Sequence, residues 1–182
     1  VPGYELASLM CPTETVELDQ RTATITLGAT EQQTCTFVHR PVDRSPISGV
    51  AQIGTGLYHS CARLVSGQVR CWGADDSGQL GDGGSSPATS PQEVLAPGGV
   101  GPLEGVRDLA VGSSHSCAVL GSGEVRCWGV GALGRPVGWP PFSSLPVVVE
   151  NGAGTGALSG IDQVTAGQSV SCGLETTGQV VC

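Results

Sequence analysis

The chain has 182 residues, a hydrophobic fraction of 39% and a formal net charge of −8 at pH 7. All eight basic residues are arginines, and the chain lacks the clustered lysine and arginine that a nucleic-acid surface needs to neutralise phosphates. Only 4% of the residues are aromatic whereas 29 are glycines, a composition typical of many short strands joined by tight turns.

The first predicted elements are strands in residues 1–40, which do not follow the pattern of the later chain. Residues 13–18 and 21–27 alternate like paired strands, and residues 33–38 predict a third strand. Cys11 and Cys35 are the only cysteines outside the repeated blocks that follow, which predicts a disulfide between them.

Part of this region resembles a known kind of domain. Residues 23–28 and 34–37 resemble the last strands of small immunoglobulin-like or prealbumin-like domains of bacterial surface proteins. The resemblance implies that residues 1–40 are the C-terminal strands of a β-sandwich-like domain. Residues 41–47 are then an extended linker that contains two prolines.

A block with two cysteines ten positions apart, and a glycine six positions after the first, occurs three times in the rest of the chain. The cysteine pairs are Cys61 and Cys71, Cys117 and Cys127, and Cys172 and Cys182, and the glycines are Gly67, Gly123 and Gly178. The first cysteines of successive blocks are 56 and 55 residues apart, a period in the range of propeller blades.

Each block predicts a β-hairpin, because apolar and polar residues alternate on both sides of the glycine. A three-residue loop over residues 65–67, with Gly67 in the left-handed region, places Cys61 opposite Cys71. Opposed residues of antiparallel strands have Cα atoms roughly 4.5 to 5.5 Å apart, which a disulfide can span. We therefore expect a disulfide in each hairpin, in preference to reduced buried cysteines or a zinc site that includes His59.

Further strands complete the repeat. A strand precedes each hairpin at residues 50–53, 106–109 and 161–164, and another follows the first two hairpins at residues 91–95 and 145–149. Four strands per repeat are typical of an all-β propeller blade.

These blocks resemble the regulator-of-chromosome-condensation repeat. The resemblance lies in residues 56–61 (Gly-Leu-Tyr-His-Ser-Cys), the Cys-Trp-Gly at 71–73 and the loop at 75–83, and it extends over about residues 48–182. It implies a β-propeller, commonly of seven blades, in which Trp72 and Trp128 pack between blades. The repeats are expected at 48–106, 107–161 and, in part, 162–182. Since the third copy stops at Cys182, we expect a longer polypeptide or a homopolymer to complete the ring.

Several residues are candidates for functional sites. His59 and His115 hold equivalent positions and are expected to be structural. Asp75, Asp76 and Asp82 gather carboxylates as calcium sites do, but their spacing does not match an EF-hand loop, and a polar turn is favoured. Trp139 and Phe142, in a proline-rich insertion at residues 137–146, are candidate anchors for a partner, with local packing as the alternative.

The even number of cysteines indicates an oxidising compartment, and hence a secreted or cell-surface protein. No apolar run approaches transmembrane length. The sequence therefore predicts a non-enzymatic propeller of a bacterial surface protein, without cofactor, metal or nucleic acid, that binds proteins or glycans in adhesion or assembly. A secreted inhibitor of an enzyme and a subunit of a homopolymeric filament are the alternatives.

Overall fold

The computed structural model describes residues 4–10, 22–26, 32–41, 46–131, 134 and 141–182. The chain forms two compact units, residues 1–45 and residues 46–182. The regular elements of the described residues are all β-strands, so none of them is a helix suited to crossing a membrane.

The amino-terminal unit contains a three-stranded antiparallel sheet. Its strands are β1 (Tyr4–Met10), β2 (Thr22–Thr26) and β3 (Gln32–Pro41), in the order β1-β3-β2. Strands β2 and β3 coincide with predicted strands, whereas β1 was not predicted, and β3 continues to Pro41, where the linker was expected to begin. The predicted strand at 13–18 and Cys11 lie outside the described residues, so the disulfide with Cys35 stays a prediction.

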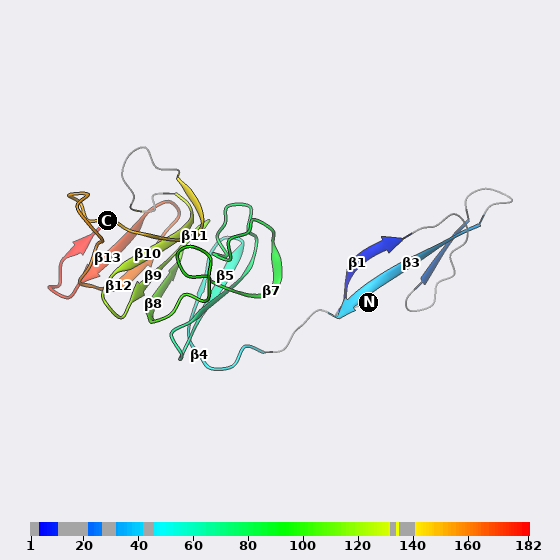
Figure 1. The fold of residues 1–182 in the computed structure, drawn as a ribbon, viewed down its shortest axis with the longest axis horizontal. Coiled ribbons are helices and arrows are strands. Elements are labelled where there is room, and N and C mark those ends of the chain that lie inside the picture. The colour runs from blue at the N-terminus through cyan, green and yellow to red at the C-terminus, as the bar shows by residue number, and fades with distance from the viewer. Residues whose placement is uncertain (1–3, 11–21, 27–31, 42–45, 132–133, 135–140) are drawn as a thin grey trace. The chain divides into compact units, whose positions relative to one another are not determined.

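The second unit, called the repeat unit below, contains three antiparallel sheets (Figure 1). The first is β4 (Val50–Thr55), β5 (His59–Leu64), β6 (Val69–Gly73) and β7 (Ala88–Glu93). The second is β8 (Val106–Val111), β9 (His115–Leu120), β10 (Val125–Val130) and β11 (Phe142–Val148). The third is β12 (Ile161–Ala166), β13 (Ser171–Glu175) and β14 (Val180–Val181). In each sheet, strands adjacent in sequence are paired, which confirms the prediction of all-β propeller blades.

The fourth strand of a blade is placed differently from the prediction. Strand β7 covers residues 88–93 instead of 91–95, and β11 covers 142–148 instead of 145–149. Register shifts after Cys71 and Cys127 allow the pairing to continue toward the beginning of these strands. The sequence pattern of a regular strand does not reveal such irregularities.

The hairpins have the predicted register. Cys61 lies opposite Cys71, and the amide of Leu64 donates to the carbonyl of Gln68 at 2.8 Å, which closes a three-residue loop. The loop glycines Gly67, Gly123 and Gly178 have φ angles of 83°, 82° and 87°. The structure contains the disulfides Cys61–Cys71, Cys117–Cys127 and Cys172–Cys182, each with Cα atoms 4.1 Å apart. The disulfide and the zinc site are mutually exclusive, so the zinc alternative at these cysteines is wrong.

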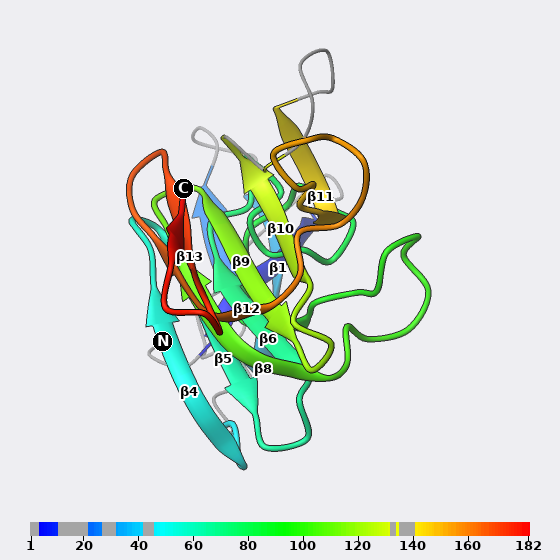
Figure 2. The same cartoon turned by 90° about the vertical axis from the view of Figure 1, so that its left-hand side faces the viewer.

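The three sheets pack face to face in chain order, from cyan to red in Figures 1 and 2. The core between the first two sheets contains the Cys61–Cys71 disulfide, Leu80, Leu109 and Trp128. The core between the second and third contains the next disulfide and residues such as Val119, Val125 and Ile161. The first strands of successive sheets also contact one another, as expected for strands near the axis of a propeller.

Candidate functional site

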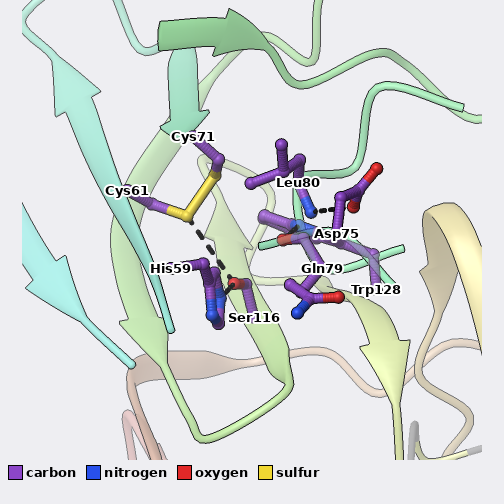
Figure 3. Close-up of a disulfide and its surroundings, with 8 residues drawn as sticks. All are labelled: His59, Cys61, Cys71, Asp75, Gln79, Leu80, Ser116 and Trp128. Atoms are coloured by element: carbon purple, nitrogen blue, oxygen red, sulfur yellow. Dashed lines mark hydrogen bonds between the residues drawn. A yellow bond between two sulfur atoms is a disulfide. The ribbon is translucent and has the colours of Figure 1, made fainter. Parts of the chain in front are cut away.

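A histidine of one blade is hydrogen-bonded to a serine of the next blade at two equivalent places. His59 Nε2 lies 2.9 Å from Ser116 Oγ (Figure 3), and His115 Nε2 lies 2.8 Å from Ser171 Oγ. Each histidine begins the second strand of its blade, which aims the ring at the blade that follows. In the third blade Val170 takes this position, and its side chain is exposed.

Both histidines are neutral at physiological pH. Burial lowers the pKa of His59 to about 4, with a further contribution from the charge of His115, and burial also lowers the pKa of His115. A catalytic pair needs a serine that substrate can reach and a group that orients the histidine through Nδ1. Ser116 is completely buried, and Nδ1 of each ring is buried without a hydrogen-bond partner in the described residues. The geometry is therefore that of a link between blades.

Small residues allow these links to form. A Cβ atom on Gly56 would clash with the carbonyl oxygen of Gly112 in the next blade and with the ring of His59. Gly112 has the same relation to Gly167 and to the ring of His115. The repeated Gly-x-x-His-Ser spacing is thus explained by close approach of successive loops.

The loop between β6 and β7 reaches from the first blade to the second. Asp75 Oδ1 accepts a hydrogen bond from the Leu80 amide at 2.9 Å, and the Leu80 side chain is completely buried (Figure 3). The indole of Trp128 donates to the carbonyl of Gln79 at 2.9 Å. Trp128 therefore packs between blades, as the resemblance implied, whereas the equivalent Trp72 is only half-buried.

The carboxylates of Asp75 and Asp82 accept hydrogen bonds from backbone amides of the same loop. Burial raises the pKa of Asp75 to about 6; the hydrogen bond from Leu80 opposes this shift, and the charges of Asp82 and Asp76 add to it. Asp82 Oδ1 accepts a hydrogen bond from the Gly84 amide at 2.8 Å. Within the described part of the chain, no three histidine, cysteine or carboxylate side chains are grouped as metal ligands.

A second link joins all three blades near the axis. Asp108 Oδ1 accepts a hydrogen bond from the side-chain amide of Gln52 at 2.9 Å, and its Oδ2 accepts one from the Val164 backbone at 2.7 Å. Gln52 belongs to the first blade and Val164 to the third. Sequence reasoning missed this residue, although Gln52 and Asp108 are one repeat period apart.

A cavity of about 500 Å³ lies between the second and third blades, and its walls, which include Val125, Val149 and Val181, are mainly apolar. Between the first and second blades, Trp128 lies in the corresponding place, against Gly81 and beside Val94. The cavity therefore corresponds to a place that an aromatic side chain fills between the first and second blades.

The exposed apolar side chains form the remaining candidate surface. Leu57 and Tyr58, in the loop between β4 and β5, are 62% and 70% exposed. Phe142 is 42% exposed, and its ring lies close to Gly78 in the loop after β6. Trp139, the other predicted anchor, lies outside the described residues.

Comparison with known proteins gives matches to a single kind of repeat. Two family profiles, both described as the regulator of chromosome condensation (RCC1) repeat, match residues 50–79 and 106–135, and residues 66–119. The human E3 ubiquitin-protein ligase HERC2 is 37% identical over 83 residues, 46% of this chain and 2% of that protein. The ultraviolet-B receptor UVR8 of Arabidopsis thaliana is 34% identical over 88 residues, 47% of this chain and 19% of that protein.

Solved structures show the same fold. The crystal structure of human WBSCR16 matches with a TM-score of 0.61 and 21% identity, over 79% of this chain and 34% of that one. A chain of the structure of Kap60 bound to yeast RCC1 (Prp20) matches with a TM-score of 0.57 and 18% identity, over 93% and 36%. This chain therefore spans about a third of the length of its structural neighbours. Residues 50–79, 66–119 and 106–135 are thus similar to the regulator-of-chromosome-condensation repeat, and the repeat unit has the fold of β-propeller blades.

Proposed function

We propose that this chain is a non-enzymatic, protein-binding part of an extracellular or cell-surface protein. The observation that carries the proposal is one disulfide in the hairpin of each blade, always in the same register. Such disulfides persist in oxidising compartments and are rare where glutathione and thioredoxin keep thiols reduced.

The binding role is supported by the propeller repeats and by the exposed loops at their ends. Propellers commonly present loops to partners while the packed blades stay rigid. The structural neighbour from yeast was solved in a complex with Kap60, which is a protein partner of that propeller. The accessible surface of the described residues includes the apolar side chains of Leu57 and Tyr58.

Differential alkylation of the native protein in intact source cells tests the compartment. The cells are quenched with acid and the protein is denatured, and its free thiols are blocked with iodoacetamide. The cysteines released by reduction are then labelled with a second reagent for mass spectrometry. We expect peptides that contain Cys61, Cys71, Cys117 and Cys127 to carry only the second label. The first label at these cysteines would show a reducing compartment and overturn the extracellular assignment.

The narrower predictions, a bacterial source, adhesion or assembly, glycan binding, enzyme inhibition and a homopolymer, stay predictions. Surface biotinylation of the same cells, followed by detection of the native chain, would distinguish display on the cell from release into the medium.

A further inference from the structure

The loops at one end of the repeat unit form a continuous row. The amide of Leu57 donates to the carbonyl of Ser113 at 3.4 Å, and the amide of Ser113 donates to the carbonyl of Gly167 at 3.2 Å. The loop after β6 joins this row, because the Ala74 amide donates to the Tyr58 carbonyl at 2.8 Å. These four loops, residues 56–58, 74–87, 112–114 and 167–170, are called the loop end below.

The charged side chains of the loop end are all acidic. It contains Asp75, Asp76 and Asp82 and no arginine. Asp76 is exposed and Asp82 half-exposed, and the buried Oδ2 of Asp75 accepts no hydrogen bond in the described residues. The described arginines of the repeat unit lie at the opposite end, each within two residues of the terminus of its strand: Arg63, Arg70, Arg107 and Arg126. None of these four loops carries a basic side chain, and Arg135, in the loop that follows β10, lies outside the described residues.

Two large apolar side chains, those of Leu57 and Tyr58, project from the loop between β4 and β5 at this end. The second blade has Ser113 and Ser114 at the positions of Leu57 and Tyr58, so the repeat does not require apolar residues there. Both serines remain half-exposed although the first blade packs next to them, which shows that these loop positions face solvent within a stack of blades.

A different cause accounts for the exposure of Ile53 on the neighbouring strand β4. Ile53 is 65% exposed, but Leu109, at the same position of the second blade, is only 4% exposed because the first blade covers it. Ile53 thus lies on an uncovered blade face. Leu57 and Tyr58 are exposed because of their place in the loop, and they mark a contact surface independent of blade packing.

We propose that the loop end binds a cationic segment of a partner protein, with Leu57 and Tyr58 as apolar anchors and Asp76 and Asp82 as the charges that attract lysine or arginine. An exposed tyrosine offers both a large contact area and an aromatic face for a cation. Carboxylates at the rim of such a contact increase the association rate and select the sign of the partner's charge. The inference rests on the proposed protein-binding function and specifies its partner chemistry.

Fluorescence anisotropy with the oxidised 182-residue chain tests this inference. The probe is a fluorescein-labelled peptide Gly-Arg-Leu-Arg-Leu-Arg-Gly, and the control peptide has glutamate in place of each arginine. We expect Leu57→Ser and Tyr58→Ser each to weaken binding of the arginine peptide by about tenfold. These substitutions install the serines that the second blade already carries, so the fold should tolerate them. Raising the salt concentration from about 50 mM to about 500 mM should also weaken binding, because the contact includes charges.

Val65→Ser is the matched control, because Val65 is 75% exposed in the hairpin loop at the opposite end. This variant should bind the arginine peptide like the unmodified chain. Absence of binding, equal binding of the glutamate peptide, or equal effects of the Val65 and Tyr58 variants would each overturn the proposal. Concentration-dependent self-association that Tyr58→Ser abolishes would assign the surface to a second copy and would also overturn it. Since the alkylation experiment concerns only the compartment, the two proposals fail separately.

Discussion

Ser60 and Ser116 occupy the same position in successive blades but have different surroundings. Ser116 Oγ lies 2.9 Å from the buried Nε2 of His59, whereas Ser60 is half-buried and its side chain makes no hydrogen bond within the described residues. Ser116→Ala should therefore lower the free energy of unfolding by about 1 to 2 kcal/mol, since it leaves the imidazole unpaired. Ser60→Ala should change it by less than about 0.5 kcal/mol. Urea unfolding of the two variants provides the comparison, and equal losses would contradict the role of the histidine link.

Asp75 makes the effect of a neutral substitution depend on pH. Its folded pKa, about 6, is above the ordinary value of 3.8, so its favourable contribution is present below pH 3.8 and lost as the pH rises through 6. An asparagine at this position would keep an oxygen acceptor for the Leu80 amide without this ionisation. Asp75→Asn should raise the free energy of unfolding by about 1 to 2 kcal/mol at neutral pH. The gain is smaller than the free energy that corresponds to the whole pKa shift of Asp75, because the amide N–H groups of the asparagine are buried without a partner.

This gain should disappear in acid. The unmodified chain and the variant are compared at each pH, so the titration of His59 and His115 affects both equally. Urea unfolding near pH 4 and near pH 7, bracketing the shifted pKa, measures the difference. A gain of the same size at both pH values would show that ionisation of Asp75 is not the cause.

The hairpin glycines differ in their neighbours although their backbone angles agree. Gly67 and Gly178 have φ angles of 83° and 87°. A Cβ on Gly67 would lie 3.2 to 3.3 Å from backbone atoms of Gly105 and Val106, whereas none of the described atoms lies within 4 Å of a Cβ on Gly178. Gly178→Val should cost on the order of 1 kcal/mol from strain alone, and Gly67→Val should cost more because of the added clash. Thermal unfolding of both variants gives the order, and a larger loss at Gly178 would contradict it.

The elements that the sequence predicts well are those set by local pattern. Alternation on both sides of Gly67 was enough to place the strands, the turn and the register of Cys61 with Cys71. The fourth strands were misplaced because register shifts after Cys71 and Cys127 interrupt the alternation between paired strands. The amino-terminal strand β1 was missed because its sequence lacks a clear polar and apolar alternation.

The links between blades could not be predicted in the same way. His59 and Ser116 are 57 residues apart, and neither carries a local signal of the other. The period of the repeat is the usable clue, because one period after His59 is His115, which precedes Ser116. The period does not specify which side chains face the next blade, since this depends on the packing angle of the sheets. Trp128 was assigned to packing only through the family resemblance, and the structure adds its hydrogen bond to Gln79.

Across the whole repeat unit, stability depends on contacts that couple one blade to the next. Each blade buries one face of its sheet against the adjacent blade, so part of its stability comes from that interface. Asp108 is the side chain that connects three blades, through Gln52 on one side and Val164 on the other. By contrast, the nearby ion pair of Arg107 and Asp162 lies at the surface, with side chains 38% and 49% exposed.

Asp108→Ala should therefore reduce stability more than Asp162→Ala. Its loss leaves the Val164 amide without an acceptor and removes one of the two hydrogen bonds of the Gln52 amide, for a cost of about 2 kcal/mol. Asp162→Ala removes an exposed ion pair and should cost less than about 1 kcal/mol. Hydrogen exchange should also be faster in both β4 and β12 of the Asp108 variant, because the Asp108 side chain on β8 is hydrogen-bonded to both of these strands. Faster exchange in only one of these strands would show that the three blades are not coupled through Asp108.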